Sequence, residues 1–320
     1  MTLNPEKLLK DFETGSKRAL ARLISLIENN GKLADDLRDA LYQKSGRAYR
    51  IGFTGPPGAG KSTLVNQITK AYRQQGKTVG IIAVDPTSPF TGGALLGDRV
   101  RMNDLTLDDG VFIRSMATRG SLGGLSTKAQ EVADILDAFG KDIIIYETVG
   151  VGQSELDIVE AADTTVVVLV PESGDSIQAM KAGLMEIADI FVMNKADREG
   201  ADRAIRELSA ILHLREARDW QPPIVKCVAV KQEGIHELLA AIDQHHAFLQ
   251  EHHLLEEKRR ERFVKSVHSL VSTRLKNEFW DERARQILEQ HIAGLDQRKT
   301  SPYRAAQQLI DNFKESLAKQ

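Results

Sequence analysis

A glycine-rich stretch followed by a lysine and two hydroxyl residues, GFTGPPGAGKST at 52–63, carries the clearest chemical signal in the chain. Residues 55–62 fit the spacing G-x-x-x-x-G-K-[ST]. Glycines here let successive backbone N–H groups point at phosphate oxygens, and the N-terminus of a following helix adds partial positive charge. Lys61 can reach the outer phosphates, and the Ser62 hydroxyl can bind Mg²⁺. The motif predicts a nucleoside triphosphate site made of Gly55, Pro56, Pro57, Gly58, Ala59, Gly60, Lys61, Ser62 and Thr63.

The base is indicated by a second stretch, Asn194-Lys195-Ala196-Asp197, which follows the apolar run DIFVM. A carboxylate at Asp197 can accept hydrogen bonds from N1–H and the 2-amino group of guanine. Adenine lacks both groups and would leave a buried charge unpaired, which is costly. Asn194 can bridge the base and the phosphate loop, and the stem of Lys195 can lie along the ring. We therefore expect GTP or GDP rather than ATP, with Ala229 as a further residue of the site.

Carboxylates that end two other apolar runs are candidates for binding Mg²⁺. Glu147 follows DIIIY, and Gly150 behind it can bring a backbone N–H against the γ-phosphate, which would make this segment sensitive to hydrolysis. Asp85 ends TVGIIAVD and is followed by a long segment that reaches Asp98. A turn that merely ends the strand is the alternative interpretation of Asp85. The predicted metal ligands are Ser62, Asp85, Asp98 and Glu147.

The elements that must position these residues divide the chain into three parts. Residues 1–47 are predicted to be helical, with Ser16 as an N-cap before an apolar stripe. Residues 48–247 alternate helical patterns with short apolar runs: YRIGFTG, TVGIIAVDP, VFIRSM, DIIIYET, TTVVVLVP, DIFVMNK and PIVKCVAV. Such runs suit strands buried on both faces, so we predict an α/β domain with a mostly parallel central sheet flanked by helices. Residues 248–320 are predicted to form a helical, highly charged arm.

The arm has more apolar surface than a solvated appendage needs. One stripe consists of Phe263, Val267, Leu270, Val271 and Leu275. Ser301-Pro302 is typical of an N-cap and first-turn pair that opens a last helix. Extended arms often bury such stripes on a second subunit, so we predict a homodimer formed mainly through the arm. Packing of the arm back onto the α/β domain is the alternative.

Composition sets limits on partners and compartment. Forty-three basic residues stand against 45 acidic ones, which gives no general attraction to nucleic acid or an anionic membrane. The one cysteine, Cys227, excludes an internal disulfide and is expected to be a small core residue. No apolar run approaches the roughly 18 residues needed to cross a bilayer. We expect a cytoplasmic protein that binds neither nucleic acid nor membrane.

Further motifs, taken in order, resemble one known family. They are DPTSPFTGGALLGDRVRMND, RGSLGGLS, ETVGVGQSE, PESGDSIQAMKAGLMEIAD and NKAD. Residues 45–247 are similar to the MeaB/ArgK GTPases, which serve adenosylcobalamin-dependent acyl-CoA mutases, methylmalonyl-CoA mutase above all. The resemblance implies a homodimeric P-loop GTPase that gates cofactor loading and protects or reactivates the mutase. A cobalamin adenosyltransferase is a further partner that it implies.

The resemblance also assigns roles to individual residues. Asp85, Asp98 and Glu147 become the Mg²⁺ and switch carboxylates, and the segment around Gln178 and Lys181 becomes an additional mobile switch. The catalytic set is then Lys61, Glu147, Gln178 and Lys181.

The chain also departs from the common GTPase pattern. Val151 follows Gly150 where Ras-like GTPases carry a water-orienting glutamine, so slow intrinsic hydrolysis is expected. Glu147 is one methylene longer than the usual aspartate, so Asp85 or Asp98 is the alternative residue for binding the metal directly in its place.

Two other functional classes remain open from the residues alone. A GTP-dependent metallochaperone typically carries a His- or Cys-rich tract, and a small-molecule kinase needs an acceptor pocket and a base. The pairs His245-His246 and His252-His253 suggest a metal site at first sight. Their separation along a helix, about 10.5 Å, is too large for imidazoles that each lie about 2 Å from one zinc. We therefore interpret the four histidines as a solvated helix face.

Overall fold

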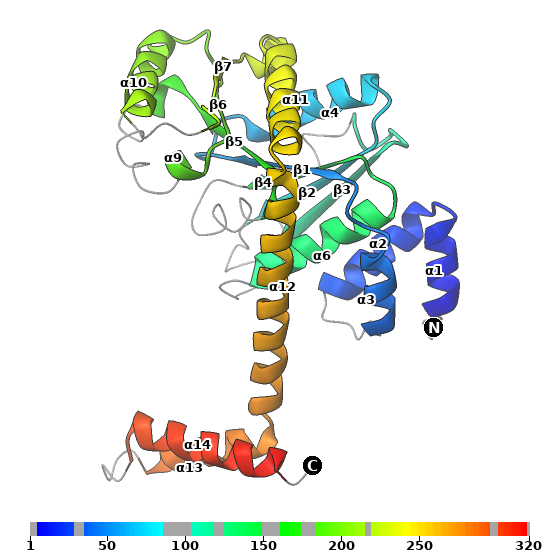
Figure 1. The fold of residues 1–320 in the computed structure, drawn as a ribbon, viewed down its shortest axis with the longest axis vertical. Coiled ribbons are helices and arrows are strands. Elements are labelled where there is room, and N and C mark those ends of the chain that lie inside the picture. Colours follow the sequence, from blue (N-terminus) through cyan, green and yellow to red (C-terminus); the bar gives the residue numbers. More distant parts are fainter. Residues whose placement is uncertain are drawn as a thin grey trace. The chain divides into compact units, whose positions relative to one another are not determined.

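The computed structural model describes residues 5–28, 35–85, 104–117, 124–148, 161–173, 184–214, 219–294 and 300–318 (Figure 1). This part of the chain forms a seven-stranded sheet in the order β3-β2-β4-β1-β5-β6-β7. All neighbouring strands pair in parallel. The strands are β1 (Tyr49–Thr54), β2 (Val79–Asp85), β3 (Val111–Ala117), β4 (Ile143–Thr148), β5 (Thr164–Leu169), β6 (Ile190–Met193) and β7 (Ile224–Lys226).

Helices flank the sheet, and further helices follow it in the sequence. They are α1 (Pro5–Glu13), α2 (Lys17–Glu28), α3 (Asp35–Tyr42), α4 (Lys61–Gln74), α6 (Gly124–Ala138), α9 (Leu184–Ile187), α10 (Ala201–His213), α11 (Ile235–Glu251), α12 (Leu254–Phe279), α13 (Glu282–Ala293) and α14 (Pro302–Leu317). Two short 3₁₀ turns, η1 (Pro171–Ser173) and η2 (Ala229–Lys231), follow β5 and β7. The predicted α/β architecture with a parallel central sheet is therefore confirmed.

Both faces of the sheet are covered, which explains why its strands are apolar throughout. Ile81 of β2 belongs to the core cluster that includes α4 and α11, whereas the next residue, Ile82, belongs to the cluster on the opposite face that includes α6. Figure 1 shows α4 and α11 on one side of the sheet and α6 on the other. Every residue of β1, β4 and β5 is buried. Because helices cover the sheet on both faces, its strands appear in the sequence as uninterrupted apolar runs.

The amino-terminal helices complete the α6 side of the core. The Ser16 hydroxyl accepts a hydrogen bond from the backbone N–H of Ala19 (3.3 Å), as predicted for an N-cap of α2. Leu20, Leu23 and Ile24 are fully buried in the same cluster as residues of α6. The predicted stripe therefore faces the α/β core.

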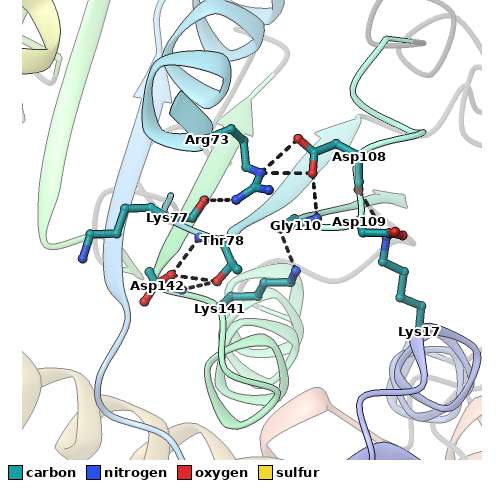
Figure 2. A network of polar contacts seen from close by, with 9 residues as sticks. All are labelled: Lys17, Arg73, Lys77, Thr78, Asp108, Asp109, Gly110, Lys141 and Asp142. Carbon is teal, nitrogen blue, oxygen red and sulfur yellow. Dashed lines mark hydrogen bonds and ion pairs between the residues drawn. The ribbon is translucent and has the colours of Figure 1, made fainter. Parts of the chain in front are cut away.

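A polar network closes the amino-terminal edge of β2, β3 and β4 (Figure 2). Arg73, at the end of α4, donates from Nε to both carboxylate oxygens of Asp108 (3.0 and 3.1 Å). Lys17 of α2 donates to the Asp108 carbonyl (3.2 Å), and Lys141 donates to the Gly110 carbonyl (2.8 Å). Burial, aided by the nearby cations Lys17 and Arg73, lowers the pKa of Lys141 to about 8. The network ties the turn before β3 to α2 and α4.

Two sequence expectations need correction in this region. The run PIVKCVAV was expected to be one strand, but β7 ends at Lys226 and residues 229–231 form η2. His245 was expected on a solvated face, yet it is 1% exposed. Its Nδ1 lies 2.6 Å from the Thr164 hydroxyl and its Nε2 lies 3.4 Å from the Asp189 carboxylate. His246 also departs from the expectation, because it is half-buried and its ring stacks on Tyr49 with 3.8 Å between the ring centroids, whereas His252 and His253 are exposed, as expected.

The chain divides into two compact units, residues 1–259 and 260–320. In the first unit, the start of α12 is held by Lys258, which donates to the Asp163 carbonyl (2.8 Å). In the second unit, α13 and α14 share a small core of Ala284, Ile287 and Leu309. The Ser301 hydroxyl accepts from the backbone N–H of Arg304 (3.3 Å), which confirms the predicted N-cap of α14.

The apolar stripe on α12 is partly exposed. Its five members are between 38% and 52% exposed: Phe263, Val267, Leu270, Val271 and Leu275. None of the helices in the described ranges combines the length and apolar character that a membrane crossing requires.

Candidate nucleotide-binding site

The glycine-rich loop lies between β1 and α4, as its spacing predicts. Gly55, Gly58 and Gly60 have φ values of 134°, 74° and 89°, which side chains of L-residues rarely adopt. A Cβ on Gly55 would lie 2.1 Å from the Val168 carbonyl oxygen, and one on Gly60 would lie 2.3 Å from Nδ2 of Asn194. All three glycines are therefore required for the curvature of the loop, and Gly55 and Gly60 also for its close contact with β5 and the Asn194 side chain.

Lys61 is the first residue of α4, and its amine turns back over the loop. Nζ donates to the carbonyl oxygens of Gly55 (2.7 Å) and Pro56 (3.0 Å), and the residue is only 5% exposed. The ammonium group is thus held within the loop whose backbone would surround phosphates.

Ser62 and Glu147 come together directly beneath the loop. Glu147 lies near the end of β4, in register with Phe53 of β1, so the parallel pairing carries it to the carboxyl edge of the sheet. The Ser62 hydroxyl donates to Oε1 of Glu147, which is 5% exposed. A hydroxyl and a carboxylate are the hard oxygen donors that Mg²⁺ prefers. These two of the four predicted metal ligands therefore fit the ion chemically.

Of the other predicted metal ligands and switch residues, only Asp85 lies in a described strand. Asp85 is the last residue of β2, which neighbours β4. Asp98, Gly150, Gln178 and Lys181 lie outside the described residues. Within the described ranges, no group of three or more histidine, cysteine, aspartate and glutamate side chains is arranged to hold a metal ion.

Asn194 connects three loops at the other end of the site. It follows β6 and is 3% exposed. Its Nδ2 donates to the Ala59 carbonyl (2.7 Å), and its Oδ1 accepts from the backbone N–H of Ala229 (3.1 Å). The sequence predicted that Asn194 contacts the phosphate loop, and that Ala229 belongs to the same site. In the structure, the Asn194 side chain contacts both Ala59 of the phosphate loop and Ala229.

Lys195 and Asp197 stand on the turn that follows. Lys195 has a left-handed φ of 55° and donates from Nζ to the Gly58 carbonyl (2.8 Å), which draws its stem across the end of the loop. The Asp197 carboxylate, 39% exposed, accepts from the ammonium of Lys231 at 3.0 Å. This hydrogen bond lowers the pKa of Asp197 and raises that of Lys231. Lys231 was missed in the sequence, where nothing in its neighbourhood marks it as a partner of Asp197.

Cys227, between β7 and η2, is a structural residue as expected. It is 1% exposed, its thiol donates to the Gly234 carbonyl (3.3 Å), and burial raises its pKa to about 12. A thiol in this state is not a nucleophile at neutral pH.

A parallel sheet with a glycine-rich loop after β1, an ammonium within that loop and a hydroxyl–carboxylate pair beneath it defines a P-loop NTPase. The comparison with protein families is more specific: residues 20–284 match the family described as methylmalonyl-CoA mutase-associated GTPase MeaB. The chain belongs to this family, which confirms the resemblance inferred from its motifs.

Individual relatives agree with this assignment. A protein of Pyrococcus abyssi is 48% identical over 309 residues, which cover 95% of each chain. The GTPase ArgK of Escherichia coli is 38% identical over 243 residues, 73% of each chain. A solved structure of a LAO/AO transport system kinase is 28% identical with a TM-score of 0.73, and the match covers 98% of this chain and 100% of that one.

Proposed function

We propose that this chain binds GTP and GDP with Mg²⁺, hydrolyses GTP, and acts as a chaperone for an adenosylcobalamin-dependent acyl-CoA mutase, most directly methylmalonyl-CoA mutase. The observation that carries the nucleotide part is the convergence of Asn194, the phosphate loop and Ala229, with the Asp197 carboxylate on the adjoining turn. The partner is proposed from the description of the family.

In this proposal each described residue has a distinct task. The backbone N–H groups of residues 58–62 would surround the β- and γ-phosphates, since Pro56 and Pro57 have none, and the Lys61 ammonium would turn from the carbonyl oxygens of Gly55 and Pro56 to phosphate oxygens. Ser62 and Glu147 would hold Mg²⁺, with Asp85 and Asp98 as further candidates. When bound, the ion neutralises negative charge that develops on the phosphates. Asp197 would accept the two donors of the guanine edge, and Asn194 would keep the base-binding turn against the phosphate loop.

Hydrolysis by the chain alone should be slow, because Val151 occupies the position after the switch glycine and cannot orient water by hydrogen bonding. We propose that the mutase accelerates hydrolysis by acting on the segment that carries Gln178 and Lys181, with Lys181 as the supplied cation. A cation delivered to the transferring phosphoryl group can raise the rate by about 10³- to 10⁵-fold.

Replacing Lys181 by alanine tests that role. GTP affinity and basal turnover should stay close to wild type, while most of the mutase-stimulated increment should disappear in single-turnover measurements. Equal stimulation of the variant and the wild type would exclude Lys181 as the cation.

Titration calorimetry with GDP and ADP, followed by analysis of reaction products, tests the proposal as a whole. Strong preference for GDP and release of inorganic phosphate from GTP are expected. Equal affinities for GDP and ADP would overturn the guanine assignment, and transfer of the phosphoryl group to a small acceptor would favour a kinase. Co-purification with a cobalamin-dependent mutase, with or without an adenosyltransferase, would identify the partner.

A further inference from the structure

The base-binding turn and the segment after β7 are joined by more than Asn194. The backbone N–H of Ala196 donates to the Cys227 carbonyl (3.1 Å), and the backbone N–H of Ala229 donates to Asn194 (3.1 Å). The third connection is made by side chains, from Lys231 to Asp197 at 3.0 Å. Lys231 itself is fixed by a backbone hydrogen bond to the Val228 carbonyl (2.9 Å). The ammonium therefore approaches Asp197 from a backbone that is itself anchored to the turn.

We propose that Lys231 is a positioning residue for guanine recognition, which acts by holding the Asp197 carboxylate in the orientation that receives the guanine edge. This inference rests on the proposed binding of guanine nucleotides and adds a residue to that site.

The hydrogen-bonding capacity of a carboxylate allows both partners at once. Each carboxylate oxygen has two lone pairs, and a guanine edge occupies one on each oxygen through N1–H and the 2-amino group. Oδ2 of Asp197 keeps a second lone pair for Lys231, so the base need not displace the ammonium. Because the hydrogen bond from Lys231 already restricts the Asp197 carboxylate, that side chain loses less conformational freedom when the base binds, and this favours binding.

The charge of Lys231 matters for the same step. A bound base covers Asp197 and removes water from it, and burial disfavours the ionised carboxylate that guanine requires. An adjacent ammonium counteracts this penalty without donating to the base. Exposed pairs of this kind contribute little by themselves, but a pair that becomes covered by a ligand contributes more.

The chain offers a matched control. Lys226, at the end of β7, also pairs with an aspartate that lies on a neighbouring segment, with 2.6 Å between its Nζ and Oδ1 of Asp202. Both pairs are solvent-exposed, with lysine side chains 53% and 58% accessible. Lys226→Met and Lys231→Met thus remove the same charge from the same part of the fold, and differ in whether the partner is Asp197.

Calorimetry with GDP and inosine diphosphate on the full-length variants tests the proposal. Inosine lacks the 2-amino group, so the ratio of the two affinities reports how well Asp197 meets that group. Lys231→Met should weaken GDP binding roughly three- to tenfold and lower the GDP-to-IDP affinity ratio, whereas Lys226→Met should change neither. If the two variants change GDP affinity and the GDP-to-IDP ratio equally, while the wild type still prefers GDP, then the inference about Lys231 is wrong and the proposed function stands. A wild type that does not prefer GDP to ADP would instead overturn the proposed function.

A second background separates positioning from general attraction to phosphate. Asp197→Asn converts the acceptor edge into one suited to xanthosine diphosphate, and Lys231 then has no carboxylate to hold. Adding Lys231→Met to Asp197→Asn should leave the affinity for xanthosine diphosphate unchanged. If that affinity falls as much as GDP affinity falls in the parent, Lys231 acts on the phosphates and the proposal is wrong.

Discussion

Replacing Asn194 by alanine should damage both the nucleotide-free fold and nucleotide binding. The side chain is 3% exposed and makes two hydrogen bonds, one to the Ala59 carbonyl (2.7 Å) and one from the Ala229 N–H (3.1 Å). Its removal leaves a buried acceptor and a buried donor without this partner. Each such group costs about 1 to 3 kcal/mol, so we expect the free energy of unfolding to fall by about 2 to 4 kcal/mol once the loop relaxes.

Asn66→Ala is the matched control, because Asn66 is a buried asparagine that donates to Asp104 (2.9 Å) away from the base-binding turn. We expect a smaller loss, close to a single hydrogen bond, or about 1 kcal/mol. Asn194→Asp keeps the shape but places a carboxylate oxygen against the Ala59 carbonyl. It should therefore be at least as unstable as Asn194→Ala.

Urea unfolding of the nucleotide-free proteins, with GDP titration calorimetry on the same samples, measures both effects. Asn194→Ala should have a lower unfolding midpoint than Asn66→Ala and should bind GDP more weakly. If Asn194→Ala matches Asn66→Ala in stability and binds GDP like wild type, the loops are not held together by this side chain.

Three further predictions concern other parts of the chain. Burial lowers the pKa of His245 to about 4, so between pH 6.5 and 4 the unfolded chain binds a proton that the folded chain does not. The unfolding free energy should therefore fall by up to about 3 kcal/mol as the pH is lowered from 6.5 to 4. In urea unfolding, His245→Gln should not show this pH-dependent loss. Gly55→Ala should destabilise the fold more than Gly140→Ala in thermal unfolding, because both have positive φ but only the first Cβ meets a carbonyl; equal losses would contradict the contact. Val267→Glu with Val271→Glu should convert the homodimer predicted from the sequence to monomer in light scattering, and a dimer that persists would point to another interface.

The parts of the site that could be predicted are those encoded locally. The spacing of residues 55–62 specifies its own loop conformation, and Asn194 follows an apolar run that could only be a strand end. Lys231 and His245 could not be found in this way, because their partners are remote in sequence. Asp197 and Lys231 meet only when β6 and β7 pair, and His245 meets Thr164 and Asp189 only when α11 packs on the sheet.

The strand prediction failed at one place for a related reason. Residues 227–230 are as apolar as the strands before them, but they pack as the loop and 3₁₀ turn that carry Ala229 to Asn194. At residues 227–229 the apolar pattern records burial, and burial of a loop against the nucleotide site produces the same pattern as burial of a strand, whereas Val230 is apolar but 79% exposed.

Single-turnover hydrolysis of GTP, measured with the full chain alone and with methylmalonyl-CoA mutase added, tests the central claim most directly. We predict slow release of inorganic phosphate by the chain alone and a large acceleration by the mutase, with no turnover of ATP in either case. An unchanged rate with the mutase and with other adenosylcobalamin-dependent acyl-CoA mutases would contradict the account.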